Sequence, residues 1–182
     1  MTITESAPAP TDRRRFPWRI LLGLVVALFA AFWVWALFFA SKEAINKIGD
    51  RAWAARAEAI CAEAELRREA LADFRRVDEN DAAMMAERGN LVDSATDVVE
   101  EMLDDVVAVT PADDKGAAIV PDWEADYRTY LENRRAYADV LRAGRNEPFT
   151  EAAVDGIPIS DKLDRFAGDN EMPSCAPPLD LN

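Results

Sequence analysis

Carboxylates are the side chains of this sequence most able to do chemistry, and several of them stand in adjacent pairs. These pairs are Glu100–Glu101, Asp104–Asp105 and Asp113–Asp114. Such groups bind calcium or act as general acid and base when they share a site. Asp113 and Glu124 have the separation of the first and last EF-hand ligands, but Lys115 and Ala117 stand where that loop requires oxygen ligands. No spacing brings two of these acids into one cleft, so we expect neither a metal site nor a catalytic site here.

Histidine is absent from the sequence. Its absence removes the commonest general base and the commonest transition-metal ligand together. Ser/His/Asp and Cys/His nucleophile systems are excluded, and so are histidine-based zinc sites. An enzyme would have to work with acidic residues alone. We therefore expect a non-catalytic protein with no bound metal or cofactor.

The two cysteines, Cys61 and Cys175, are the remaining reactive groups. Both follow the apolar segment described below, on the side that we expect outside the cytoplasm. In an oxidising compartment an even pair indicates a disulfide. A metal pair would need further soft ligands, and no CxxC redox motif is present. We predict a Cys61–Cys175 disulfide that ties the C-terminal end to the first helix of the outer domain.

An aromatic row is the strongest candidate for recognition of a partner or ligand. Its members are Trp123, Tyr127, Tyr130 and Tyr137. Tyr and Trp offer rigid contact area with a polar group at one end, as interaction hot spots do. The same spacing of three to four residues also fits a helix that packs its aromatics into a core. Core packing is the simpler expectation, and Tyr137 is its clearest exception because it lies off the main stripe.

The stretch from Ile20 to Ala40 contains 21 residues without a charge. A helix of that length spans about 30 Å, the thickness of the hydrocarbon core of a bilayer. We predict a transmembrane helix over residues 17–40. A cleaved signal peptide is the alternative. The apolar run is longer than a usual signal, and bulky Phe38 lies three positions before the best cleavage point, after Ala40.

Basic residues precede this segment and mixed charges follow it. Arg13, Arg14, Arg15 and Arg19 come before it, whereas Lys42 and Lys47 are interleaved with Glu43 and Asp50. The positive-inside rule then puts the N-terminus in the cytoplasm and residues 41–182 outside, as a single-pass protein of the cell membrane. Residues 1–16 have no apolar periodicity and are expected to form a disordered cytoplasmic tail.

The net charge of −13 divides into +2 for residues 1–40 and −15 for residues 41–182. An acidic outer domain is a poor candidate for binding nucleic acid or an anionic lipid surface. It suits a cationic partner or a wall environment rich in divalent ions. The simpler interpretation is that the acids are solvated faces of helices.

Helical patterns account for most of the outer part. We predict helices from Ser41 to about Val77, from about Leu91 to Val109, and from Pro121 or Asp122 to Gly144. A short helix over 149–154 and another beginning at Ser160 complete an all-α bundle with one disulfide. Residues 112–120 are expected to be a linker.

Two segments with cysteines carry a family resemblance, AEAICAEAE around Cys61 and MPSCAPP around Cys175. With the single apolar segment, they resemble actinobacterial single-pass membrane-anchored helical proteins that pair one early with one late cysteine. The resemblance covers about residues 41–178 and implies an exported helical bundle with a disulfide. It supplies no functional residues beyond Cys61 and Cys175.

The most economical function is an accessory or scaffolding subunit of a membrane or envelope assembly. Such a subunit would contact lipid through residues 20–40 and another membrane or envelope protein. A small-xxx-small pattern, Gly23 with Ala27, offers a route to a homodimer. The alternative is an envelope sensor or small-ligand-binding domain. A pocket with convergent polar groups between the second and third outer helices would favour ligand binding, and a filled core with an exposed apolar strip would favour a protein partner.

Overall fold

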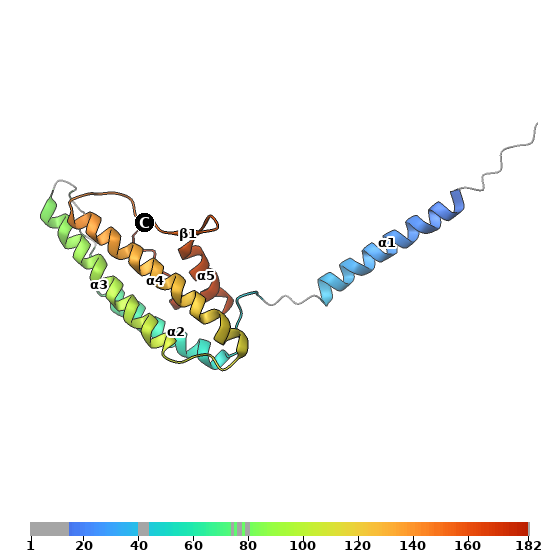
Figure 1. Cartoon of the computed structure of the whole chain (residues 1–182), viewed down its shortest axis with the longest axis horizontal. Helices are drawn as coiled ribbons and strands as arrows, with labels where there is room; N and C mark the ends of the chain where they lie inside the picture. The colour runs from blue at the N-terminus through green and yellow to red at the C-terminus, as the bar shows by residue number, and fades with distance from the viewer. Residues whose placement is uncertain (1–14, 40–43, 74, 76–77, 79–80, 182) are drawn as a thin grey trace, which may run out of the picture. The chain divides into compact units, whose positions relative to one another are not determined.

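The computed structural model describes residues 15–39, 44–73, 75, 78 and 81–181 (Figure 1). Most of the expected cytoplasmic tail, residues 1–16, lies outside this range. The chain divides into two compact units, Met1–Glu43 and Ala44–Asn182, and each is described by itself.

In the first unit the structure describes residues 15–39, and these contain the helix α1 (Arg15–Phe38). Its segment Ile20–Phe38 has the length and apolar composition needed to cross a membrane, and none of that segment is buried within the protein. The expected apolar N-terminal helix is therefore confirmed as a helix.

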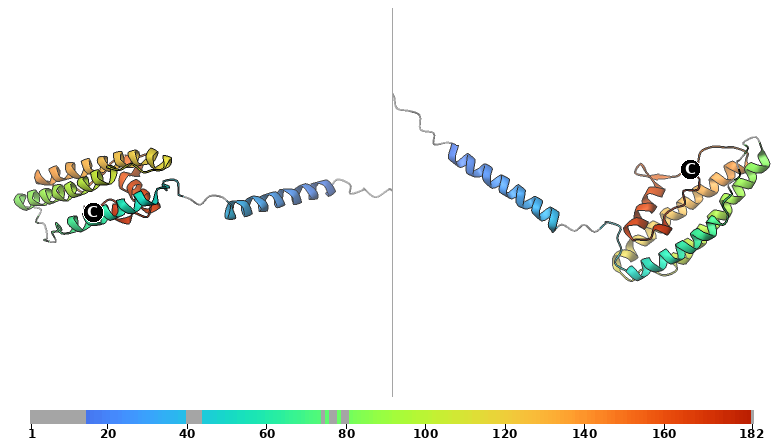
Figure 2. Two further views of the ribbon diagram at one scale, coloured as in Figure 1. Left: turned by 90° about the horizontal axis from the view of Figure 1, so that it is seen from below. Right: turned by 180° about the vertical axis from the view of Figure 1, so that it is seen from behind.

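The second unit is a helical domain built on three long helices, α2 (Arg51–Glu69), α3 (Ala82–Val107) and α4 (Asp114–Arg142). Helices α3 and α4 lie side by side along most of their length, and α2 packs beside α3 (Figures 1 and 2). A hairpin of β1 (Ala153–Val154) and β2 (Ile157–Pro158) follows α4. Helix α5 (Ile159–Asp169) and the 3₁₀ turn η1 (Pro173–Cys175) then close the domain. The predicted helical bundle is confirmed.

The boundaries of α2, α3 and α4 differ from the sequence expectation because an aspartate N-cap decides where each of these three helices starts. Asp50 caps α2, so the segment from Ala44 to Asp50 is not helical and the helix expected from Ser41 begins at Arg51. Asp81 accepts hydrogen bonds from two backbone N–H groups, and α3 begins nine residues before Leu91. Asp113 caps α4, which places Pro121 inside the helix and turns most of the expected linker helical.

The short helix expected over residues 149–154 is wrong, because this stretch enters the β1–β2 hairpin. The two-residue turn consists of Asp155 at φ 53° and Gly156 at φ 77°. An Asp-Gly pair adopts such positive φ values readily and matches the twist of a tight hairpin. Ser160 does not cap α5; its backbone N–H and its hydroxyl both donate to the Glu151 carboxylate.

Asp50 and Asp113 join the starts of α2 and α4. Each accepts from its own helix, at Trp53 N and Gly116 N, and each also accepts from the other's segment. The Asp113 carboxylate receives the Asp50 N–H at 2.9 Å, and the Asp50 carboxylate receives the Ala112 N–H at 2.8 Å. The backbone N–H of Ala112 is the main cause of a lowered pKa at Asp50, and that of Gly116 is the main cause at Asp113.

These lowered pKa values predict loss of stability in acid. Both carboxylates stay ionised in the folded protein at pH values where the unfolded chain takes up protons, so their contribution is present above the ordinary value of 3.8 and is lost as the pH falls below it. The urea concentration at the midpoint of unfolding should therefore decrease as the pH is lowered from 6 to 2.5, mainly below pH 3.8. Asp113→Asn retains a capping oxygen but does not titrate, so the urea midpoint of this variant should decrease less in acid. An equal decrease in the variant and the wild type would contradict a contribution from the Asp113 carboxylate.

Asn170, at the end of α5, holds the segment that precedes α2. This side chain is completely buried, as is Ile48 at 1% exposure. Its amide oxygen accepts from Ile48 N at 2.8 Å, and its amide nitrogen donates to Asn46 O at 3.0 Å and to Phe166 O at 2.9 Å. Two distant parts of the sequence are thereby fixed to each other at one end of the domain.

Gly89 allows α3 and α4 to approach closely. A Cβ atom at this position would lie 2.7 Å from the Ala138 carbonyl oxygen and 2.9 Å from Arg142 Cγ. We expect Gly89→Ala to lower the free energy of unfolding by about 1–2 kcal/mol. This is a net value, because the higher helix propensity of alanine offsets roughly 1 kcal/mol of the steric cost.

Gly168 in α5 provides the matched control for that measurement. A Cβ atom there meets nothing within 4 Å, so Gly168→Ala should raise stability by about 0.5 kcal/mol. Equal urea midpoints for the two variants would contradict the close approach at Gly89.

Candidate functional site

The predicted disulfide is formed. Cys61 of α2 and Cys175 of η1 are bonded with their Cα atoms 5.1 Å apart, across a sequence separation of 114 residues. Both side chains are completely buried. Beside them the Glu58 carboxylate accepts from the N–H and the hydroxyl of Ser174, at 3.0 and 2.9 Å. The cysteines therefore serve to fix η1 against α2.

Three members of the aromatic row lie in the core. Trp123, Tyr127 and Tyr130 are at most 3% exposed, as their helical spacing predicts. Trp123 stacks on Phe166 with ring centroids 5.2 Å apart. Tyr137 is the exception: it is only partly buried and meets Phe149 edge to face at 5.6 Å. Only Tyr137 remains accessible to a ligand.

The two buried tyrosines bind the C-terminal segment of the chain itself. Tyr130 Oη donates to the Pro178 carbonyl at 2.7 Å, and Tyr127 Oη donates to the Ala176 carbonyl at 3.4 Å. Burial is the main cause of the raised pKa of both phenols. Alternate residues of the extended tail thus meet successive turns of α4.

Arg134, one turn further along α4, makes the next contact with the tail. Its side chain is completely buried and forms a two-point ion pair with Asp180, at 2.6 and 3.1 Å. Its Nε–H donates to Thr96 Oγ1 at 3.0 Å. Burial acts to raise the pKa of Asp180, but the hydrogen bonds and charge of Arg134, together with the charge of Arg68, outweigh it and leave the pKa lowered. Sequence reasoning missed this pair.

The acidic face of α3 is engaged by a row of arginines on α4. Arg128 binds Asp104, Arg135 binds Asp97 and Glu100, and Arg142 binds Asp93. On α2, Arg67 binds Glu101. Most members are partly exposed, so each pair contributes little alone. Within the described residues, no group of three or more His, Cys, Asp or Glu could hold a metal ion.

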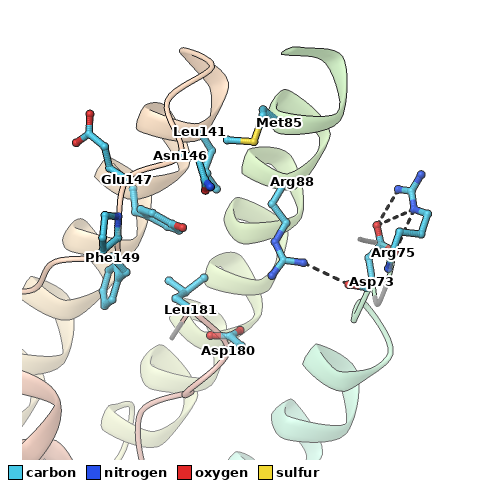
Figure 3. Close-up of a pocket in the computed structure, with 12 residues that line it drawn as sticks. Asp73, Arg75, Met85, Arg88, Leu141, Asn146, Glu147, Phe149, Asp180 and Leu181 are labelled. Carbon is cyan, nitrogen blue, oxygen red and sulfur yellow. Dashed lines mark hydrogen bonds and ion pairs between the residues drawn. The ribbon is translucent and has the colours of Figure 1, made fainter. Parts of the chain in front are cut away.

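A cavity of about 620 Å³ lies where α3, the end of α4 and the C-terminal segment meet (Figure 3). Its lining includes Met85, Arg88, Tyr137, Leu141, Phe149 and Leu181. A second cavity of about 260 Å³, lined by Leu71, Leu91, Val92 and Ala95, also has Arg88 and Leu181 in its wall. Arg88 and Leu181 therefore lie between the two cavities, the first of which is lined by both polar and apolar side chains. No pattern in the sequence predicted these cavities.

The comparisons with known proteins identify no relative. No protein family model matches the chain, and neither a curated protein nor a solved structure is detectably similar to it.

Proposed function

We propose that this protein is a non-catalytic, single-pass membrane protein with its N-terminus in the cytoplasm. In this proposal α1 crosses the cell membrane, and the acidic helical domain lies outside it. There the domain acts as an accessory or scaffolding subunit of a membrane or envelope assembly.

One observation supports this function above the others. The groups that the sequence offers for chemistry are engaged in holding the domain together: the cysteines with each other, two tyrosines with the tail, and the paired carboxylates of α3 largely with arginines. By contrast, the large apolar side chains of Ile20–Phe38 are 49–77% exposed. An apolar surface of this length supports the proposal that lipid or another membrane helix covers it.

Purification of the tagged full-length protein from its native membranes in a mild detergent tests the proposal. Quantitative mass spectrometry should find one or two membrane proteins in near-equal amounts with it. Recovery of the protein alone, or as a simple homodimer, would contradict the accessory role. Protease added to spheroplasts should digest residues beyond Ser41, and complete protection would reverse the proposed topology.

The cavity beside Arg88 favours a second candidate function, binding of a small ligand in the envelope. Its volume of about 620 Å³ lies within the range of known ligand sites. The cavity lies between α3 and α4, the second and third long helices of the domain, where a pocket was expected to favour ligand binding. Tyr137 of the aromatic row lines it.

A further inference from the structure

We propose that the cavity between α3 and the end of α4 binds a small amphipathic monocarboxylate through Arg88. This inference rests on the second candidate function above and names the class of ligand. It requires an apolar body that fills the cavity and one carboxylate that reaches the guanidinium group.

Apolar and polar groups both line the cavity, and the apolar part would contact the body of the ligand. Met85 and Leu141 lie behind this part of the wall and are almost completely buried, at 0% and 2% exposure. Phe149 and Leu181 come from two further segments and face the same space (Figure 3). A cavity of about 620 Å³ has room for a compact aromatic or medium-chain aliphatic group.

The charges around the cavity single out Arg88. The acidic residues in its wall already have arginine partners: Asp73 binds Arg75, Asp180 binds Arg134, and Glu147 binds Arg145. Arg88 makes one hydrogen bond with the described residues, to the Asp73 carbonyl oxygen at 3.3 Å. No carboxylate among them pairs with it. Among the described residues of the wall, Arg88 is therefore the arginine with N–H donors left for a ligand.

The same surroundings limit the charge of the ligand. Asp73, Asp180 and Glu147 stand in the wall, and the outer domain as a whole is acidic. One guanidinium group balances one negative charge, and a dianion such as a phosphate monoester would meet repulsion from these carboxylates. A monocarboxylate matches Arg88, which has no carboxylate partner among the described residues, and the two-point geometry that arginine prefers.

Two polar side chains at the cavity are suited to orient the ligand. Tyr137 and Asn146 both contribute to its wall. Neither side chain forms a hydrogen bond with any residue that the structure describes. A bound carboxylate could therefore accept hydrogen bonds from them as well as from Arg88.

Calorimetric titration of the full-length protein in nanodiscs tests the inference, with 4-phenylbutyrate and octanoate as probes and empty nanodiscs as the blank. We expect saturable one-to-one binding of at least one acid, and weaker binding of the neutral amide 4-phenylbutyramide. Arg88→Gln should weaken binding at least about tenfold, because it removes a charge-assisted hydrogen bond. Arg165→Gln, which removes an exposed arginine of α5 that does not line the cavity, should leave binding unchanged.

A second variant separates loss of the site from loss of the fold. Asn146→Trp, in the loop after α4, should fill the cavity and abolish binding while the thermal unfolding curve stays that of the wild type. No saturable binding to a folded wild-type protein would overturn the inference, and so would equal binding by Arg88→Gln or by the amide. Either result leaves the co-purification test of the accessory role untouched, and a failed co-purification leaves ligand binding untouched.

Discussion

Simultaneous replacement of Cys61 and Cys175 by alanine should lower the free energy of unfolding of the outer domain by about 4–5 kcal/mol. The disulfide joins residues 114 positions apart, and a cross-link over a loop of that size removes much conformational entropy from the unfolded chain. Alanine is a better replacement than serine here, because both cysteine side chains are completely buried and serine would bury a hydroxyl group without a partner.

Urea unfolding followed by circular dichroism measures this effect. The wild type treated with reductant should move to the midpoint of the double variant, and the oxidised form should migrate faster than the reduced form on a denaturing gel. Equal midpoints with and without reductant would show that the bond contributes nothing to stability.

Asp180→Ala should cost about 3 kcal/mol, because it leaves the guanidinium group of Arg134 buried without its partner. Arg134 is completely buried, while Asp180 is 28% exposed, so water compensates only part of the loss. Ala176 and residues 179–181 should then exchange their backbone amide hydrogens faster. Asp122→Asn, at an exposed position on α4, should change stability by less than about 0.5 kcal/mol.

A double variant tests whether the cost arises from an unpaired charge. Arg134→Met with Asp180→Leu removes both charges and should recover most of the lost stability, because apolar side chains of similar volume replace a buried pair at little cost. If Asp180→Ala matches the wild type, or if the double variant is the least stable of the three, the ion pair does not hold the tail.

The helices were predictable because each has a local pattern, an apolar stripe of helical spacing. The errors fall where a local signal was overlooked. Asp113 is a strong N-cap that extends α4 toward its N-terminus, and Asp155-Gly156 is a hairpin turn.

The contacts of the aromatic row could not be predicted in this way. The spacing of Tyr127 and Tyr130 correctly indicates one face of a helix, but it does not say what covers that face. The partners are carbonyl oxygens 49 and 48 residues further along the chain, in a segment without periodicity. Arg134 and Asp180, 46 residues apart, were missed for the same reason.

The regular spacing of Arg128, Arg135 and Arg142 opposite the acids of α3 was present in the sequence and was overlooked.

The position of Asn170 has a consequence for the order of events during synthesis. Its partner Asn46 precedes it by 124 residues, so at ordinary translation rates about 6–25 s separate the appearance of the two. During this interval α2 lacks the C-terminal segments that cover it, and the thiol of Cys61 has no partner in its own chain. Because the sequence has two cysteines, the one wrong disulfide open to Cys61 is with a different molecule. Crowding of newly made chains would therefore favour covalent dimers, because a monomer with two cysteines can form no disulfide other than Cys61–Cys175.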